Sequence, residues 1–286
     1  MARARGEEMR SDVTHEPITG VAAGVPYVAL PPAGGGEGAP LVVAWHLMDP
    51  PRSEAAMAAA LPLTEIPAWR VYLGLPMFGS RTPAGGFDEV MNLCAEDIVL
   101  KLMGPVVQQA AAEAPAAIAA LRAELQIGDW PVGVVGGSMG SAVALLLLAE
   151  GAIPVEAAAL VSPVSQLAPV AQYFNGSYPW TEGSRSVAQR FDFVARAAEI
   201  AGRDPQPAVL LVTGNRDADA FREPAAALRD ALLDLYADLE RVSLVNVPGM
   251  GHALAEAPGI EPAPQTADAR RVDAVLTEWF RRHLGR

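Results

Sequence analysis

The chain has 286 residues, of which 51% are hydrophobic and 19% are charged, as in folded globular proteins and unlike disordered or fibrous chains. Its formal net charge is −12, and Lys101 is its only lysine. Nucleic acids and anionic membranes repel such an acidic surface, so neither is an expected partner. The most apolar run, residues 141–148, is much shorter than the roughly 20 residues of a membrane-spanning helix. We expect a soluble, cytoplasmic protein, and the heavy use of alanine, glycine, proline and arginine is typical of a bacterial gene.

The start of the chain is charged and is not followed by an apolar core of secretory length. We expect residues 1–16 to form a disordered tail and residues 17–286 to form one domain, because no change of composition marks a second boundary. The single cysteine, Cys94, excludes an internal disulfide and a zinc cluster, and its apolar neighbours indicate a buried structural thiol. The oligomeric state stays open, a homo-oligomer included.

Short apolar stretches alternate with longer helical stretches along most of the chain, which is typical of an α/β protein with a largely parallel sheet. The predicted strands are 25–30, 41–45, 70–75, 132–135, 157–161, 208–213 and 241–247. The predicted helices are 54–60, 87–125 with interruptions near Pro105 and Pro115, 141–150, 187–201, 224–236 and 266–284. The first strand suits an antiparallel hairpin at the edge of the sheet.

A strand, a sharp turn and a helix follow one another between Trp130 and Glu150, and the turn carries the pentapeptide Gly136-Gly137-Ser138-Met139-Gly140. A residue at such a corner has close neighbours on both sides, so the flanking glycines let the strand and the helix pack tightly. This geometry exposes the serine hydroxyl above the sheet. It also directs the backbone N–H groups of the first helical turn, beginning with Met139, at negative charge that develops beside the hydroxyl.

This G-x-S-x-G pattern in a strand–turn–helix context resembles the nucleophile elbow of the α/β-hydrolase family. The resemblance covers about residues 25–285. It implies a mostly parallel central sheet of about eight strands, with helices on both faces. It also implies a small cap over the active site, and residues 164–206 are the expected cap because they break the alternation of strands and helices. A Gly-rich turn that only lets a helix pack is the alternative interpretation of the pentapeptide.

A serine hydroxyl needs a base, which is normally an imidazole oriented by a carboxylate. Among the four histidines, only His252 stands in a glycine-containing loop directly after the last predicted strand. The acid should follow the preceding strand, where Asp217 fits the Gly-x-x-Asp pattern of the family and Asp219 is the substitute. The order Ser138, Asp217, His252 is that of α/β-hydrolases.

The oxyanion of the tetrahedral intermediate needs two backbone N–H donors in this family, one after the nucleophile and one after the early strand. Met139 is the first expected donor. By position Met48 is the second, although Leu47 stands where many relatives have glycine, so the choice between Leu47 and Met48 stays open. His46 is expected to be a structural hydrogen-bonding residue in this loop and not a base.

The sequence predicts a serine hydrolase that cleaves a carboxylic ester with an apolar group through an acyl-enzyme. No cofactor is expected, since no dinucleotide-binding or P-loop motif follows a strand and no side chains have metal-ligand spacing. An acyl thioesterase or acyltransferase would use the same residues, and a binding protein that retains the fold without turnover is the alternative from another class. Arg185 and Arg190 are the local cations that could bind a phosphate-rich carrier. The aromatic residues of the expected cap either line a substrate pocket or only bury the cap: Tyr173, Phe174, Tyr178, Trp180 and Phe191.

Overall fold

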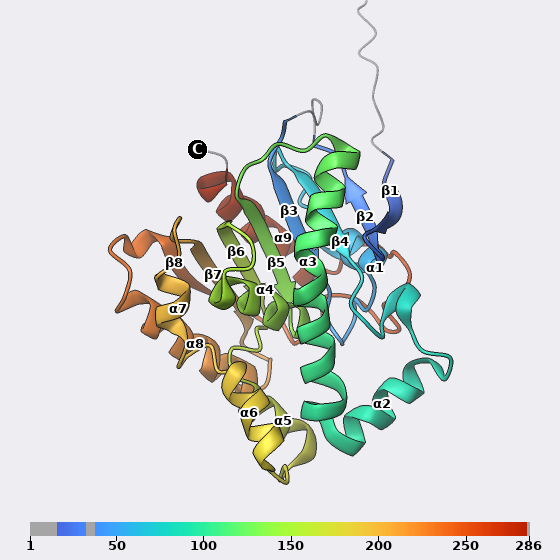
Figure 1. Cartoon of the computed structure of the whole chain (residues 1–286), viewed down its shortest axis with the longest axis vertical. Coiled ribbons are helices and arrows are strands. Elements are labelled where there is room, and N and C mark those ends of the chain that lie inside the picture. The colour runs from blue at the N-terminus through green and yellow to red at the C-terminus, as the bar shows by residue number, and fades with distance from the viewer. Residues whose placement is uncertain (1–15, 33–37, 285–286) are drawn as a thin grey trace, which may run out of the picture.

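The computed structural model describes residues 16–32 and 38–284, and within this range the strands form one eight-stranded sheet. The strand order is β1-β2-β4-β3-β5-β6-β7-β8 (Figure 1). The strands are β1 Ile18–Ala22, β2 Val25–Leu30, β3 Leu41–Trp45, β4 Trp69–Leu73, β5 Val132–Gly137, β6 Val155–Val161, β7 Ala208–Gly214 and β8 Val242–Val247. β2 pairs antiparallel with β1 and β4, whereas all the other neighbours are parallel. The predicted edge hairpin and the predicted parallel sheet are both present.

Helices cover both faces of the sheet, as Figure 1 shows, and each face has its own hydrophobic core. Side chains of α1 and α9 fill one core, and side chains of α3, α4 and α8 fill the other. The helices are α1 Glu54–Ala60, α2 Gly86–Asp97, α3 Gly104–Leu125, α4 Met139–Glu150, α5 Leu167–Asn175, α6 Glu182–Arg190, α7 Ala197–Ala201, α8 Asp219–Leu233 and α9 Ala267–His283. Because β5 is buried on both faces, the sequence of this central strand is continuously apolar and not alternating.

The helical zone 87–125 differs in detail from the prediction. A π-helical stretch, Ile98–Met103, joins α2 to α3, and Pro105 lies in the first turn of α3, where a missing N–H is tolerated. Pro115 lies inside α3 without ending it. The buried alanines around it, including Ala114 and Ala117, keep that face of the helix in the core.

The predicted helix 187–201 is wrong as a single element. It is divided between α6 and α7, and the chain between them carries Phe191 and Phe193, which are fully buried with their rings stacked. An isolated bridge between Gln166 and Asp192 holds this turn. Phe191 and Phe193 are separated by one residue, so in a regular helix their side chains would point to different sides and could not both face the core. Tertiary packing therefore overrides the helical propensity here.

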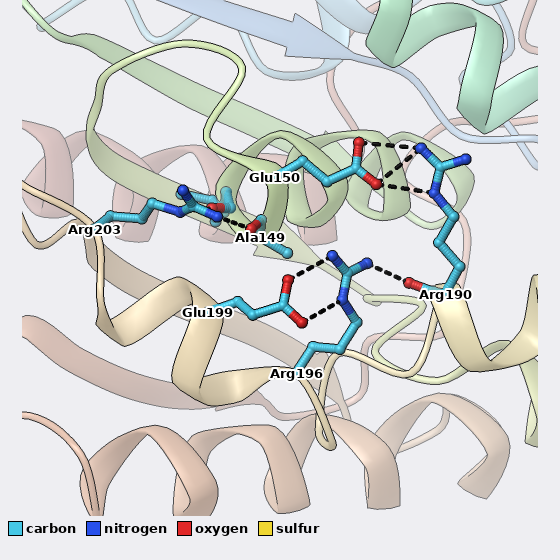
Figure 2. Close-up of polar contacts among 7 residues, drawn as sticks. Ala149, Glu150, Arg190, Arg196, Glu199 and Arg203 are labelled. Atoms are coloured by element: carbon cyan, nitrogen blue, oxygen red, sulfur yellow. Dashed lines mark hydrogen bonds and ion pairs between the residues drawn. The ribbon is translucent and has the colours of Figure 1, made fainter.

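The segment 164–206 between β6 and β7 contains α5, α6 and α7, and in Figure 1 α5 and α6 lie beyond the sheet at the bottom of the view. Arginines tie its later part to the end of α4, as Figure 2 shows. Arg190 binds both carboxylate oxygens of Glu150, at 2.8 and 3.0 Å, and Arg203 donates to the carbonyl oxygens of Leu148 and Ala149. α4 starts at the serine corner, so the segment is attached to the far end of that helix.

The predicted tail 1–16 falls outside the described residues except for Glu16, which is exposed. Cys94 is buried, as expected, and burial raises the pKa of its thiol. None of the helices in the described ranges has the length and apolar character that crossing a membrane requires.

Candidate active site

Ser138 lies at the corner between β5 and α4, with φ 45° and ψ −115°. This conformation is rare for a residue with a side chain, and strain of this kind persists only where the surroundings over-determine it. A Cβ atom on Gly136 would come within 2.4 Å of the Gly140 carbonyl oxygen, and one on Gly140 would come within 2.4 Å of the Trp45 carbonyl oxygen. Glycine is therefore required at both flanking positions, as predicted, because the contacts are with backbone that cannot move aside.

The structure brings Ser138, His252 and Asp217 together in one hydrogen-bonded chain. The His252 Nε2 atom lies 2.8 Å from the Ser138 Oγ atom. On the other side of the ring, Nδ1 lies 2.9 and 3.0 Å from the two carboxylate oxygens of Asp217. A carboxylate only accepts hydrogen bonds, so Nδ1–H donates to Asp217, and Nε2 is left to accept the serine proton. The Asp217 side chain is 1% exposed, whereas that of His252 is 18% exposed.

The loops after β7 and β8 are joined to each other, which explains why the aspartate and the histidine meet. Asn215 Oδ1 accepts from the Gly249 N–H at 2.7 Å, and the Arg216 N–H donates to the Met250 carbonyl at 3.0 Å. Gly214 lies so close to the same carbonyl that an added Cβ would come within 2.1 Å of its oxygen. The two loops follow neighbouring parallel strands, whose carboxyl ends share one edge of the sheet.

Asp219, the alternative acid, forms an ion pair with Arg222, whereas the carboxylate beside His252 Nδ1 is that of Asp217. Its side chain is 66% exposed, and it is the first residue of α8, where a carboxylate interacts favourably with the helix dipole. The geometry therefore favours Asp217 as the partner of the histidine.

The backbone N–H groups around the Ser138 hydroxyl differ in whether they are already used. The Leu47 N–H donates to the Pro51 carbonyl at 3.2 Å. Among the described residues, the Met48 N–H has no acceptor, and neither does that of Met139, the first residue of α4. Two unpaired donors, one after β3 and one after β5, match the two donors expected for an oxyanion.

Leu47, the residue that departs from the family pattern, fits its position because of a glycine across the site. Its side chain is fully buried, and a Cβ atom on Gly137 would lie only 2.3 Å from Leu47 Cδ1. Leu47 thus occupies the space that a side chain at position 137 would need. A leucine in this loop is compatible with a close approach of β3 to the serine corner.

His46 is fully buried and bridges two loops. Its Nδ1–H donates to the Leu47 carbonyl at 2.7 Å, and its Nε2 accepts from the Leu75 N–H at 3.3 Å. Burial lowers the pKa of His46 from 6.5 to about 4, against the smaller opposite effect of the Leu47 hydrogen bond. The ring is thus a neutral structural link, in agreement with the prediction that it is not a base.

This low pKa makes the folding stability depend on pH. The unfolded state takes up a proton at His46 first, so the stabilisation is complete above pH 6.5 and is lost as the pH falls to about 4. The full loss corresponds to about 3 kcal/mol. Urea unfolding should show that the stability difference between wild type and His46→Asn shrinks by this amount over that pH range. A difference that is independent of pH would contradict the account.

Comparisons with known proteins were made at three levels. No family model and no curated protein matches the sequence. Solved structures do match: TT1662 from Thermus thermophilus is 21% identical with a TM-score of 0.67, over 95% of this chain and 99% of that one. The esterase domain of a Rhodothermus marinus protein is 16% identical with a TM-score of 0.59, over 94% and 99%. The chain has the α/β-hydrolase fold.

A third solved structure that matches is a puromycin-hydrolysing peptidase of Mycobacterium tuberculosis, 19% identical with a TM-score of 0.63. The match covers 94% of the present chain but only 40% of the peptidase. All three identities are below 25%, so the likeness establishes the α/β-hydrolase fold and leaves the reaction to be argued from the site.

Asp49 is a residue of the site that the sequence analysis did not identify. It follows Met48 in the loop after β3, and its Oδ2 atom lies 3.7 Å from the His252 Nε2 atom. Its side chain is 42% exposed. No pattern in the stretch Met48-Asp49-Pro50-Pro51 indicates which way the carboxylate turns.

Aromatic side chains extend from the histidine toward the segment 164–206. The Phe221 ring lies 4.2 Å from the His252 ring between centroids, and Tyr173 packs edge-on to Phe221. Tyr173 and Phe174 keep 58% and 38% exposure, whereas Phe191 is fully buried. Of the other aromatics expected to line a pocket, Tyr178 is buried and Trp180 is half-buried, so only Tyr173 and Phe174 form an exposed pair.

Proposed function

We propose that the protein is a serine hydrolase that cleaves carboxylic esters through an acyl-enzyme. The observation that carries this proposal is the continuous hydrogen-bonded chain from Ser138 Oγ through both ring nitrogens of His252 to the buried carboxylate of Asp217. Three residues from three loops meet in this arrangement at a strained corner. A packing role alone gives no reason for it.

The reaction follows from the positions of these atoms. The Ser138 oxygen attacks the ester carbonyl carbon while His252 Nε2, 2.8 Å away, takes its proton. Asp217 holds the ring in the required tautomer and stabilises the imidazolium that forms. His252 then returns the proton to the leaving alkoxide. Water hydrolyses the acyl-enzyme by the same proton transfers in reverse.

The tetrahedral oxyanion would be bound by the N–H groups of Met139 and Met48. Their lack of acceptors among the described residues supports this assignment, and the hydrogen bond from Leu47 to Pro51 argues against Leu47 as a donor. Backbone donors that are held in position before the reaction stabilise the charge without reorganisation.

An acyl thioesterase or acyltransferase would use the same groups. Coenzyme A carries several phosphates and needs local cations, but the guanidinium of Arg190 is already paired with Glu150 (Figure 2). The net charge of −12 also opposes such a carrier. These observations argue against a phosphate-rich carrier and favour an ester without anionic groups. We further propose that the segment 164–206 is a cap whose exposed Tyr173 and Phe174 contact the apolar group of the ester.

A panel of 4-nitrophenyl esters with increasing acyl length, together with matched thioesters and amides, tests the function. We expect ester turnover that is lost in His252→Ala. Absence of turnover across the whole panel would favour a binding protein that retains the fold without catalysis.

A further inference from the structure

Asp49 adds a second carboxylate to the reaction centre. Its Oδ2 atom is 3.7 Å from the same His252 nitrogen that is hydrogen-bonded to Ser138 Oγ. Asp217 already orients the opposite side of the ring, so the proposed mechanism does not need Asp49. In the described part of the chain, Asp49 has no ion pair except the one with His252, and no hydrogen bond to its side chain is present. The charge is therefore uncompensated whenever the ring is neutral.

The Asp49 loop is fixed to the loop that carries His252. The Pro50 carbonyl accepts from the N–H groups of Leu254 and Ala255, at 2.9 and 3.3 Å. Gly259 packs so tightly on Pro50 that an added Cβ would come within 2.5 Å of the proline ring. These contacts fix the backbone beside Asp49 relative to the loop that carries His252. Such preorganisation is characteristic of groups that bind a substrate.

A negative charge in this place has a consequence for the substrate. Before Ser138 attacks, the His252 ring is neutral and the Asp49 carboxylate has no ion-pair partner, so a cation on the bound substrate can pair with it. An anionic group in the same place would be repelled. The half-exposed carboxylate is open to solvent and so can be reached by a substrate group.

We propose that Asp49 is a specificity-determining residue that selects substrates with a cationic nitrogen next to the scissile carbonyl, such as the free α-amino group of an aminoacyl ester. This inference rests on the proposed serine hydrolase function. A carboxylate facing an ammonium group forms a charge-assisted hydrogen bond. The exposed aromatic face of Tyr173 nearby is compatible with a small aminoacyl side chain.

The test compares the naphthyl esters of alanine and of propionate, which differ by the amino group, at slightly acidic pH where the amine is charged. In Asp49→Asn, the ratio of kcat/KM for alanine to that for propionate should fall about 10- to 100-fold. A naphthyl hemisuccinate should respond in the opposite direction, because its charge is negative. Asp219→Asn is the matched control: it removes an exposed aspartate paired with Arg222 and should leave the ratios unchanged.

A second substrate pair, propionylcholine and its uncharged 3,3-dimethylbutyl analogue, places the cation in the leaving group. A fall confined to this pair would support the cation site but assign it to the leaving-group side. Equal changes for charged and neutral esters in Asp49→Asn would overturn the proposal and leave Asp49 as a partner of His252 alone. Absence of Ser138-dependent turnover of every ester would instead overturn the underlying hydrolase function.

Discussion

Replacing Asp217 with asparagine should lower kcat by a factor on the order of 10⁴ while leaving the fold intact. The amide can donate a hydrogen bond to His252 Nδ1, which would move the ring proton to Nε2. Nε2 could then no longer accept the serine proton. Steady-state ester hydrolysis measures kcat, and circular dichroism checks the fold.

Asp219→Asn is the matched control for this experiment. The Asp219 side chain is 66% exposed and pairs with Arg222 at the surface, so its removal should change kcat little. If Asp219→Asn were the damaging change and Asp217→Asn the harmless one, the acid would be wrongly assigned, although the serine mechanism would stand.

Gly137→Ala should reduce kcat at least ~100-fold, because the new methyl group would lie in the space of Leu47 and displace the loop that carries Met48. Overpacking of this kind also destabilises by about 1–3 kcal/mol. Leu47→Ala removes the three Leu47 atoms that lie nearest to the new methyl group, so the double variant should recover much of the lost activity. Kinetics and urea unfolding of the wild type, both single variants and the double variant give a double-mutant cycle, which measures the coupling between positions 47 and 137.

Gly183→Ala serves as the control for a glycine-to-alanine change. This glycine lies in α6, and the nearest atom to an added Cβ is 3.9 Å away. The activity of Gly183→Ala should equal that of the wild type, and its free energy of unfolding should be equal or slightly higher. Full activity of Gly137→Ala, or a double variant as impaired as Gly137→Ala itself, would contradict the proposed fit between Leu47 and Gly137.

The meeting of Ser138, Asp217 and His252 could be predicted from the sequence because it follows from topology. Each residue comes directly after a parallel strand, and the carboxyl ends of such strands share one edge. The glycines at 136 and 140 could be predicted for a similar local reason. Gly136 lies against the carbonyl of Gly140 in the same turn, and Gly140 lies against the carbonyl of Trp45 in the neighbouring strand β3.

Asp49 and the pairing of Leu47 with Gly137 could not be predicted, since both depend on how separate loops pass one another. The Asp49 loop lies beside the His252 loop because the Pro50 carbonyl accepts hydrogen bonds from the N–H groups of Leu254 and Ala255. Pro50 and Leu254 are 204 residues apart, and no local pattern encodes such a contact. The break between α6 and α7 could not be predicted from the sequence for a related reason. Residues 187–201 have helical propensity, but the burial of Phe191 and Phe193 determines their path.

The most direct test of the account is covalent labelling with a fluorophosphonate, followed by peptide mass mapping. We expect one adduct, on Ser138, which disappears in Ser138→Ala. Ser141→Ala is the control: Ser141 is fully buried and its hydroxyl is bonded to the Ser138 carbonyl and the Val164 N–H, so this variant should still be labelled at Ser138. Labelling that persists in Ser138→Ala, or that maps to another residue in the wild type, would contradict the assignment of Ser138 as the nucleophile.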